Sequence, residues 1–296
     1  MRFITPLLVL ALLASACGAS DGGGSAGQPT ATGSGNMAAP TAAPTVGATR
    51  TTPPSSGTGA YLALGDSLSY GNGASDPTST AFVPLVRQGL GDPELINLGV
   101  PGDTSADLFA GPLEEGIQEI QRRRDDGVPG NEVSVITLEI GGNDLLKLYF
   151  SLVIPGACPD LEEGLANPAC VAGLQAALDE YGPNLRRALT RLKDAAPEVP
   201  VFLLTIYNPF SGGSPNIDEV GQLALEGEPG TLFPEGLNDI IREEGEAAGA
   251  HVVDIYPLFL GKSREYIYRD LIHPNDAGYR VMAEAVLEAM RAAGLP

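Results

Sequence analysis

Ser67 stands where a short apolar run stops, and its surroundings give it the potential to act as a nucleophile. The run Tyr61 to Leu64 is followed at once by Gly65-Asp66-Ser67. A serine hydroxyl is a weak nucleophile unless a neighbouring base accepts its proton. Histidine suits that task because its side chain changes charge near neutral pH. The first question is therefore whether the chain places a histidine beside this serine.

The chain has two histidines, and one of them is well placed. His251 opens the apolar stretch HVVDI, so it should lie at the start of a strand, away from the serine. His273 lies in a loop before the last helix, on the same side as the serine. Asp270 is three residues earlier and can reach the imidazole Nδ1, which fixes the tautomer and stabilises the imidazolium. We assign the rival Asp276 to capping of the last helix, for which Asn275 is the other candidate, and Asp66 to a local hydrogen bond.

Acyl transfer also needs hydrogen-bond donors aimed at the developing oxyanion. The amide N–H of Ser67 is one candidate, because amides at the start of a helix have no helical acceptor. Gly99 offers a backbone N–H that a ligand can approach closely. Asn143 offers a side-chain amide just after Gly141-Gly142. Each of these residues follows an apolar, strand-like segment, so all should gather at one place.

Strand-like and helix-like patterns alternate through the second part of the chain. This βα alternation predicts a parallel sheet covered by helices on both faces, a three-layer α/β/α sandwich of five strands. In such sheets ligands bind beyond the carboxyl ends of the strands. We expect strands within 60–64, 94–100, 133–141, 199–209 and 250–259, and helices within 80–90, 105–127 (broken at Gly111-Pro112), 184–197, 236–248 and 275–290.

The four segments that carry these residues resemble the signature blocks of the SGNH, or GDSL-type, hydrolases. They are Gly65-Asp66-Ser67-Leu68, Gly99, Gly141-Gly142-Asn143-Asp144 and Asp270-Leu271-Ile272-His273, in the order and spacing typical of that family. The resemblance implies a flavodoxin-like sheet and a serine ester hydrolase that needs no cofactor. It also implies Ser67, His273 and Asp270 as the triad, and Ser67, Gly99 and Asn143 as oxyanion-hole donors. The α/β-hydrolase elbow G-x-S-x-G does not fit, because Ser69 replaces its second glycine.

The N-terminal part of the chain is typical of an exported protein. Residues 1–17 combine a basic start, a short apolar run and small residues, which describes a signal peptide. Cys17 follows Ala14-Ser15-Ala16 as in a lipobox, although the leucine favoured three residues before the cysteine is absent; ordinary cleavage nearby is the alternative. Residues 18–58 are rich in Gly, Ser, Thr and Pro and predict a disordered tether. Residues 59–296 then form the catalytic domain, at the cell surface or secreted.

Composition limits the partners. The formal charge of −20 argues against nucleic acid and against direct adsorption to anionic lipid. Membrane contact is therefore expected only through a lipid on Cys17. The remaining cysteines, Cys158 and Cys170, predict one disulfide in an exported chain. With two histidines in all, no metal site is expected, and we expect a monomer.

Two insertions should decide the substrate. Residues 145–183 begin with an apolar cluster, Leu145 to Phe150, that either lines an acyl pocket or faces the core. Residues 208–235 form either a flap or a surface loop. The absence of tryptophan favours lipid or short-acyl esters over acetylated sugars. A catalytically silent envelope-binding lipoprotein of the same fold is the alternative from another class.

Overall fold

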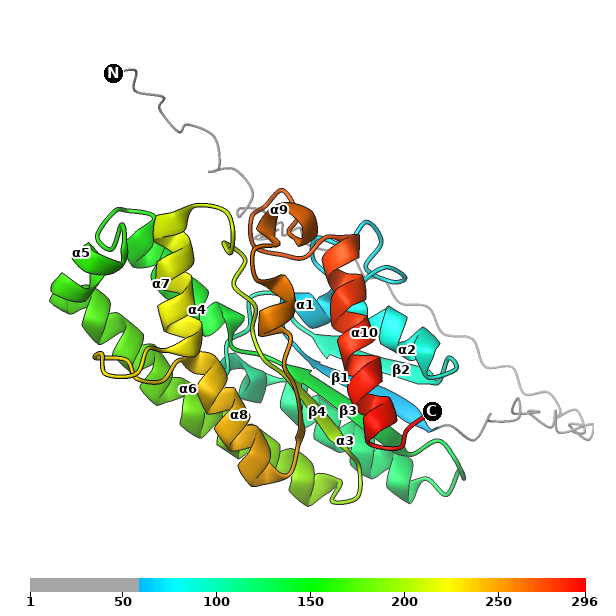
Figure 1. Ribbon diagram of the computed structural model, residues 1–296. Coiled ribbons are helices and arrows are strands. Elements are labelled where there is room, and N and C mark those ends of the chain that lie inside the picture. Colours follow the sequence, from blue (N-terminus) through cyan, green and yellow to red (C-terminus); the bar gives the residue numbers. More distant parts are fainter. Residues whose placement is uncertain (1–58) are drawn as a thin grey trace, which may run out of the picture. The chain divides into compact units, whose positions relative to one another are not determined.

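Five parallel strands form a single sheet in the computed structural model, which describes residues 59–296. The spatial order is β2-β1-β3-β4-β5, so the chain changes direction of travel between β1 and β3. A crevice for ligands forms at such a switch point, beyond the carboxyl ends of the strands. The expected five-stranded α/β fold is confirmed (Figure 1). The strands are β1 (Ala60–Gly65), β2 (Glu94–Gly99), β3 (Val133–Glu139), β4 (Val201–Leu204) and β5 (His251–Val253).

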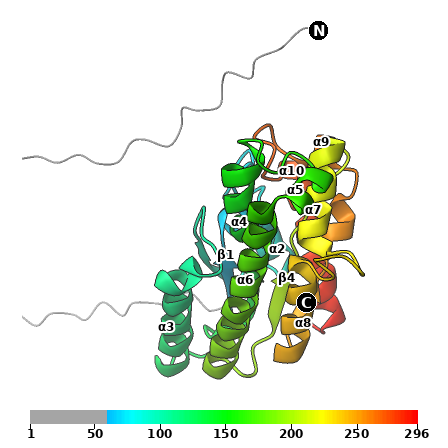
Figure 2. The same cartoon turned by 90° about the vertical axis from the view of Figure 1, so that its left-hand side faces the viewer.

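Helices cover both faces of the sheet because its central strands β1, β3 and β4 are apolar on both sides. Leu62 and Leu64 of β1 belong to the core beneath α3 (Pro112–Asp125), α6 (Pro168–Ala195) and α8 (Leu237–Ala248). Tyr61 and Ala63 belong to the opposite core, beneath α2 (Phe82–Gly89) and α10 (Asp276–Ala292). Figure 2 shows α3, α6 and α8 in front of the sheet, with α6 running most of the height of the domain. These two cores hold the strand ends in fixed positions.

Short elements cluster where strands end. Near the middle of Figure 1, just above the sheet, α1 and α4 follow the ends of β1 and β3. Their closeness to the strand ends makes them the first elements of any site at the switch point. The remaining helical elements of the domain are α1 (Ser67–Tyr70), η1 (Asp107–Ala110), α4 (Gly142–Leu148), the π-helical turn η2 (Tyr149–Val153), α5 (Leu161–Ala166), α7 (Pro215–Glu226), η3 (Tyr256–Phe259) and α9 (Ser263–Tyr266).

Both insertions contain more helix than the sequence predicted. The expected helix over 184–197 is the second half of α6, which begins at Pro168 and contains Pro183 in its interior. Pro183 does not interrupt the helix, because Gly182 lies against Ile240 of α8, and this packing stabilises the continuous helix. Residues 208–235 contain α7, an amphipathic helix, instead of an irregular loop. The last two strands are also shorter than expected.

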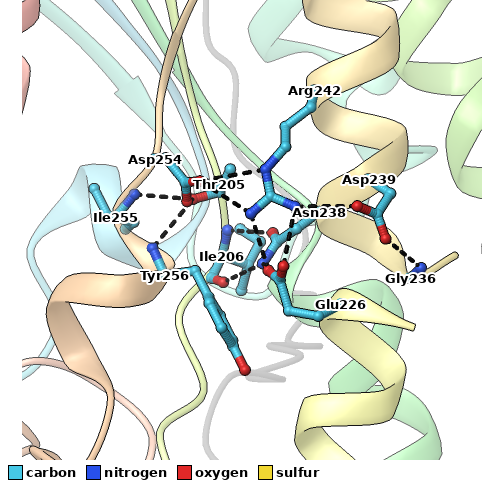
Figure 3. Close-up of polar contacts among 10 residues, drawn as sticks. All are labelled: Thr205, Ile206, Glu226, Gly236, Asn238, Asp239, Arg242, Asp254, Ile255 and Tyr256. Carbon is cyan, nitrogen blue, oxygen red and sulfur yellow. Dashed lines mark hydrogen bonds and ion pairs between the residues drawn. The ribbon is translucent and has the colours of Figure 1, made fainter. Parts of the chain in front are cut away.

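A partly buried polar network fixes the position of α7 (Figure 3). Asn238 of α8 is fully buried; its side chain accepts from the N–H of Ile206 at 2.7 Å and donates to the carbonyl of Ile206 at 2.8 Å. The same amide donates to Glu226, the last residue of α7, at 2.7 Å. Arg242 pairs with both Glu226 and Asp254 at 3.0 Å. The network therefore ties the C-terminal end of α7 to the chain beyond β4.

The described residues do not include the N-terminal segment. The expected signal peptide, Cys17 and the tether at 18–58 all lie outside residues 59–296. Among residues 59–296, none of the helices has both the length and the apolar content required to cross a bilayer.

Candidate active site

Ser67, His273 and Asp270 form one hydrogen-bonded line beyond the carboxyl end of β1. The Ser67 Oγ lies 2.9 Å from Nε2 of His273, and Nδ1 of the same ring lies 2.7 Å from Oδ2 of Asp270. Ser67 opens α1 directly after β1, whereas the other two residues lie in the loop before α10. His251 begins β5, at the opposite edge of the sheet. The structure thus brings together the three residues that the sequence suggested as a triad.

Local backbone geometry holds Asp270 in place. Its Oδ1 accepts the amides of Ile272 and His273, both at 3.0 Å, which leaves Oδ2 for the imidazole. Burial raises the pKa of Asp270, but these hydrogen bonds and the His273 ring outweigh it and lower the pKa below its usual value. Leu271, which follows Asp270, adopts φ +67°, a left-handed conformation. It turns the loop tightly enough for the amides of Ile272 and His273 to reach the same oxygen of Asp270. Asp270 is therefore an ionised, oriented partner for the ring at neutral pH.

Asp66 has a larger role than the local hydrogen bond expected of it. It caps α1, where Oδ1 accepts the amide of Leu68 at 2.9 Å, and its Oδ2 accepts the side-chain N–H of Asn143, also at 2.9 Å. Asp66 is 2% exposed, and burial raises its pKa to about 6 although the Leu68 amide opposes the change. One carboxylate thus connects the turn that carries Ser67 with the turn after β3.

The three suggested oxyanion donors differ in their availability. The N–H of Ser67 lies in the first turn of α1, where no helical acceptor exists. The N–H of Gly99 donates to the side chain of Asn97 at 3.0 Å. The side-chain nitrogen of Asn143 donates to Asp66 and, at 2.8 Å, to the carbonyl of Asp103. Gly99 and Asn143 must therefore exchange a partner before they can bind an oxyanion.

Gly99 also has a packing role. A Cβ at this position would lie 2.6 Å from the amide nitrogen of Tyr70 and 2.8 Å from Ser69, so β2 approaches α1 more closely than any side chain permits. Asn97 supports the same approach by donating to the carbonyl of Ser69 at 2.7 Å. Substitution of Gly99 would displace α1, the helix that carries Ser67. A Gly99 variant therefore cannot distinguish the packing role of this residue from its suggested role as an oxyanion donor.

Two carboxylates near the site hold loops together. Asp144 accepts the amide and the hydroxyl of Ser105 at 2.9 and 2.6 Å, which ties the loop after β2 to α4. The cap of the last helix was expected at Asn275 or Asp276; the structure confirms Asn275, and the assignment of Asp276 to capping is wrong. Asn275 caps α10, because it precedes the helix and its side chain accepts the amides of Ala277 and Gly278. Asp276 instead accepts from the amide and hydroxyl of Ser75.

A pocket of about 170 Å³ opens beside the triad and continues between the two insertions. Ser67, Asn143 and His273 line one end of it. The apolar cluster that begins at Leu145 lines the pocket instead of being fully buried in the core, and α7 supplies the facing wall. Cys158 and Cys170 form the expected disulfide beside the pocket, which joins the segment before α5 to the first turn of α6. The apolar lining includes Leu145, Leu148, Leu152, Leu174, Val220 and Phe233.

Sequence reasoning missed two features of the site. Glu139 is fully buried at the end of β3, inside a segment that was interpreted as apolar throughout; its single charge within VSVITLEIG was the available signal. The support that Asp144 gives to the loop after β2 was missed as well, because its partner is 39 residues away. Within residues 59–296, we find no group of three or more His, Cys, Asp and Glu side chains suited to a metal ion.

Serine, imidazole and carboxylate in line at the switch point of a parallel sheet are the arrangement found in serine hydrolases that form an acyl-enzyme. The chain belongs to the GDSL-like lipase/acylhydrolase family, whose sequence model matches residues 63–281. It is accordingly a carboxylic ester hydrolase with the SGNH hydrolase fold.

Similar proteins agree with this assignment. The spore germination lipase LipC of Bacillus licheniformis is 29% identical over 242 residues, which cover 79% of this chain and 95% of that protein. The lipase Lip_vut3 from a goat rumen metagenome has a TM-score of 0.54 at 25% identity and covers 80% and 98% of the two chains. An extracellular lipase from Streptomyces rimosus has a TM-score of 0.56 at 18% identity, covering 79% and 99%, and shows the shared fold.

Proposed function

We propose that this protein hydrolyses esters of apolar acyl chains through Ser67, His273 and Asp270, after export from the cell. The observation that carries the proposal is the line of two hydrogen bonds from Asp270 to Ser67, which ends at the mouth of the apolar pocket. A reacting ester carbonyl placed at Ser67 would have its acyl chain beside Leu145 and Leu148.

The mechanism has two steps. The Ser67 Oγ attacks the ester carbonyl while its proton passes to Nε2 of His273, and Asp270 stabilises the imidazolium. The imidazolium then protonates the departing alcohol, which leaves an acyl group on Ser67. Water attacks this acyl-enzyme, giving its proton to His273, and the acid departs as Ser67 recovers its proton. The N–H groups of Ser67, Gly99 and Asn143 stabilise the oxyanion in both steps.

The pocket supports an acyl chain over a sugar. Sugar hydroxyls buried against leucine, valine and phenylalanine would lose their hydrogen bonds to water without replacement, at a cost of roughly 1–3 kcal/mol each. A hydrocarbon chain gains about 0.8 kcal/mol for each methylene that it buries. The lining between α4 and α7 therefore favours esters with several methylenes and disfavours acetylated carbohydrate.

A series of p-nitrophenyl esters is expected to show this preference. Each methylene that enters the pocket should raise kcat/KM by up to about fourfold, until the pocket is filled. Ala224→Trp, which places a large ring in the pocket from α7, should abolish the gain with chain length while acetate hydrolysis stays within about threefold of wild type. Gln222 on the same helix is exposed, so Gln222→Trp should leave the dependence of kcat/KM on chain length unchanged.

Two results would contradict the acyl-chain proposal. One is a kcat/KM that is highest for acetate in the wild-type protein. The other is an equal loss on all chain lengths in the Ala224→Trp variant, which would indicate a damaged site instead of a filled pocket. Acetylated sugars assayed in parallel would identify a deacetylase.

Export and lipid attachment at Cys17 complete the proposal. They are supported by the apolar, small-residue pattern of residues 1–17 and by the disulfide, a bond typical of oxidising compartments. Expressed in a bacterial host, the full chain should incorporate labelled fatty acid and fractionate with membranes, whereas Cys17→Ser should do neither. Equal labelling of the two proteins would contradict lipid attachment.

A further inference from the structure

Glu139 is a buried acid that ester hydrolysis does not by itself explain. It is the last residue of β3, is fully buried, and pairs in the sheet with Gly65, the residue before Asp66. Neither of its carboxyl oxygens has a hydrogen-bond partner of ordinary geometry among the described residues. The groups that face it are the carboxyl and the backbone N–H of Asp66. A carboxylate in this position would be buried beside a second carboxylate.

Two adjacent buried carboxyl groups cannot both be ionised at low cost, because each would lose its hydration and repel the other. Burial and the neighbouring Asp66 raise the pKa of Glu139 well above its usual value, whereas the pKa of Asp66 rises only to about 6. The hydrogen bonds indicate which acid carries the proton of the pair: Asp66 accepts two N–H groups, as a carboxylate does, whereas the Glu139 oxygens accept none of ordinary geometry. We therefore assign the proton to Glu139 at neutral pH. Asp144 raises the pKa of Asp66 and His273 lowers it. The charges of the pair in turn contribute to the raised pKa values of the nearby phenols, which are those of Tyr181, Tyr207 and Tyr279.

We propose that Glu139 is a positioning residue, which donates a hydrogen bond from its neutral carboxyl group to Asp66 and so orients Ser67 and Asn143. The contacts of Asp66 show how this acts at a distance: one oxygen accepts the Leu68 amide beside the nucleophile, and the other accepts Asn143. A bond from Glu139 fixes the rotation of that carboxylate and keeps it ionised. The inference rests on the proposed roles of Ser67 and Asn143.

Substitutions of Glu139 separate donation of a hydrogen bond from simple filling of space. Glu139→Gln keeps a neutral donor of the same shape, and its kcat should remain within about threefold of wild type. Glu139→Met fills the site but donates nothing. Its kcat should fall roughly 10- to 100-fold with KM nearly unchanged, the pattern expected when a change acts on the transition state. The acid limb of kcat should also move to higher pH in Glu139→Met, since Asp66 loses a bond that lowers its pKa, but not in Glu139→Gln.

The contribution of the Glu139 and Asp66 pair to the stability of the protein should decrease as the pH rises. Acids whose pKa is higher in the folded than in the unfolded state bind extra protons when folded, so their stabilising contribution is lost as pH rises. Only Glu139 differs between the wild type and Glu139→Gln, and its pKa lies well above its usual value of 4.5. The Tm of the wild type should therefore fall relative to that of Glu139→Gln as the pH rises above about 4.5. Thermal scans of the two proteins across this range test the sign without reference to activity.

The deciding measurement is difference infrared spectroscopy of the wild type and Glu139→Gln at pH 7. The proposal predicts a carbonyl band of a buried protonated carboxyl in the wild type that is absent from the variant. Absence of this band, or a Glu139→Gln variant as impaired as Glu139→Met, would overturn it. If Glu139→Met does not fold, the band and the Glu139→Gln profile still decide. If the protein hydrolysed no ester but still showed the infrared band, the proposed function would be contradicted, whereas the protonation of Glu139 would be supported.

Discussion

Replacing Ser67 by alanine is expected to reduce kcat for ester hydrolysis by about 10⁴- to 10⁶-fold, because no other group in the site can form the acyl-enzyme. The fold should be retained, since Ser67 contributes little packing and its Oγ bonds mainly to His273 at 2.9 Å. Initial rates on the best p-nitrophenyl ester, with circular dichroism of the same sample, provide the measurement.

A serine two residues away provides the matched control for this substitution. Ser69 is fully buried and its hydroxyl donates to the carbonyl of Leu64 at 3.2 Å, so Ser69→Ala removes one hydrogen bond close to the nucleophile. It should cost about 1 kcal/mol of stability and leave kcat within a few-fold of wild type. A Ser67→Ala enzyme that retains more than about a tenth of wild-type activity would contradict the assigned nucleophile.

Replacing Asn143 by alanine is expected to lower kcat by about 10²- to 10³-fold with a small change in KM, as loss of an oxyanion donor does elsewhere. In the free protein its amide donates to Asp66 and Asp103, so the substrate must compete for one of these bonds. Steady-state kinetics on a short and a long ester measure the effect, which should be equal for both because the donor acts on the carbonyl and not on the chain.

Asn184→Ala is the comparison for this second experiment. Asn184 also donates through its side chain, to the Ser105 hydroxyl at 3.2 Å, and so supports the same loop at a distance from the reacting carbonyl. We expect less than a threefold change in kcat for it. Equal effects of the two substitutions would show that Asn143 acts by supporting the loop, and that Ser67 and Gly99 bind the oxyanion without it.

The sequence predicts the sheet and the clustering of the site for a physical reason. Parallel strands of this βα pattern all end at the same edge, so residues that follow them, such as Ser67 and Asn143, must be neighbours. The assignment of His273 was possible because the chain has a single alternative, His251, which starts a strand. The direction of the strands and the identity of the residues at their ends are enough to place these side chains together.

Features that depend on packing between distant segments could not be predicted. The helix expected over 184–197 begins at Pro168 instead, because the contact of Gly182 with α8 stabilises it on both sides of Pro183. Asp276 looked like a cap because it stands beside Asn275, and only the fold shows Ser75 within its reach. Glu139 was hidden for the same reason. The strand register that places it opposite Gly65 cannot be read from an apolar run.

We propose Ser67 as the nucleophile, activated by His273 and Asp270. Labelling with a fluorophosphonate probe, followed by mass spectrometry of the digested protein, tests it most directly. We expect one adduct per chain, located on Ser67, together with loss of ester hydrolysis. We also expect no adduct on Ser67→Ala and normal labelling of Ser69→Ala. An adduct on any other residue, or an unlabelled wild-type protein that is folded and hydrolyses esters, would show that Ser67 is not the nucleophile.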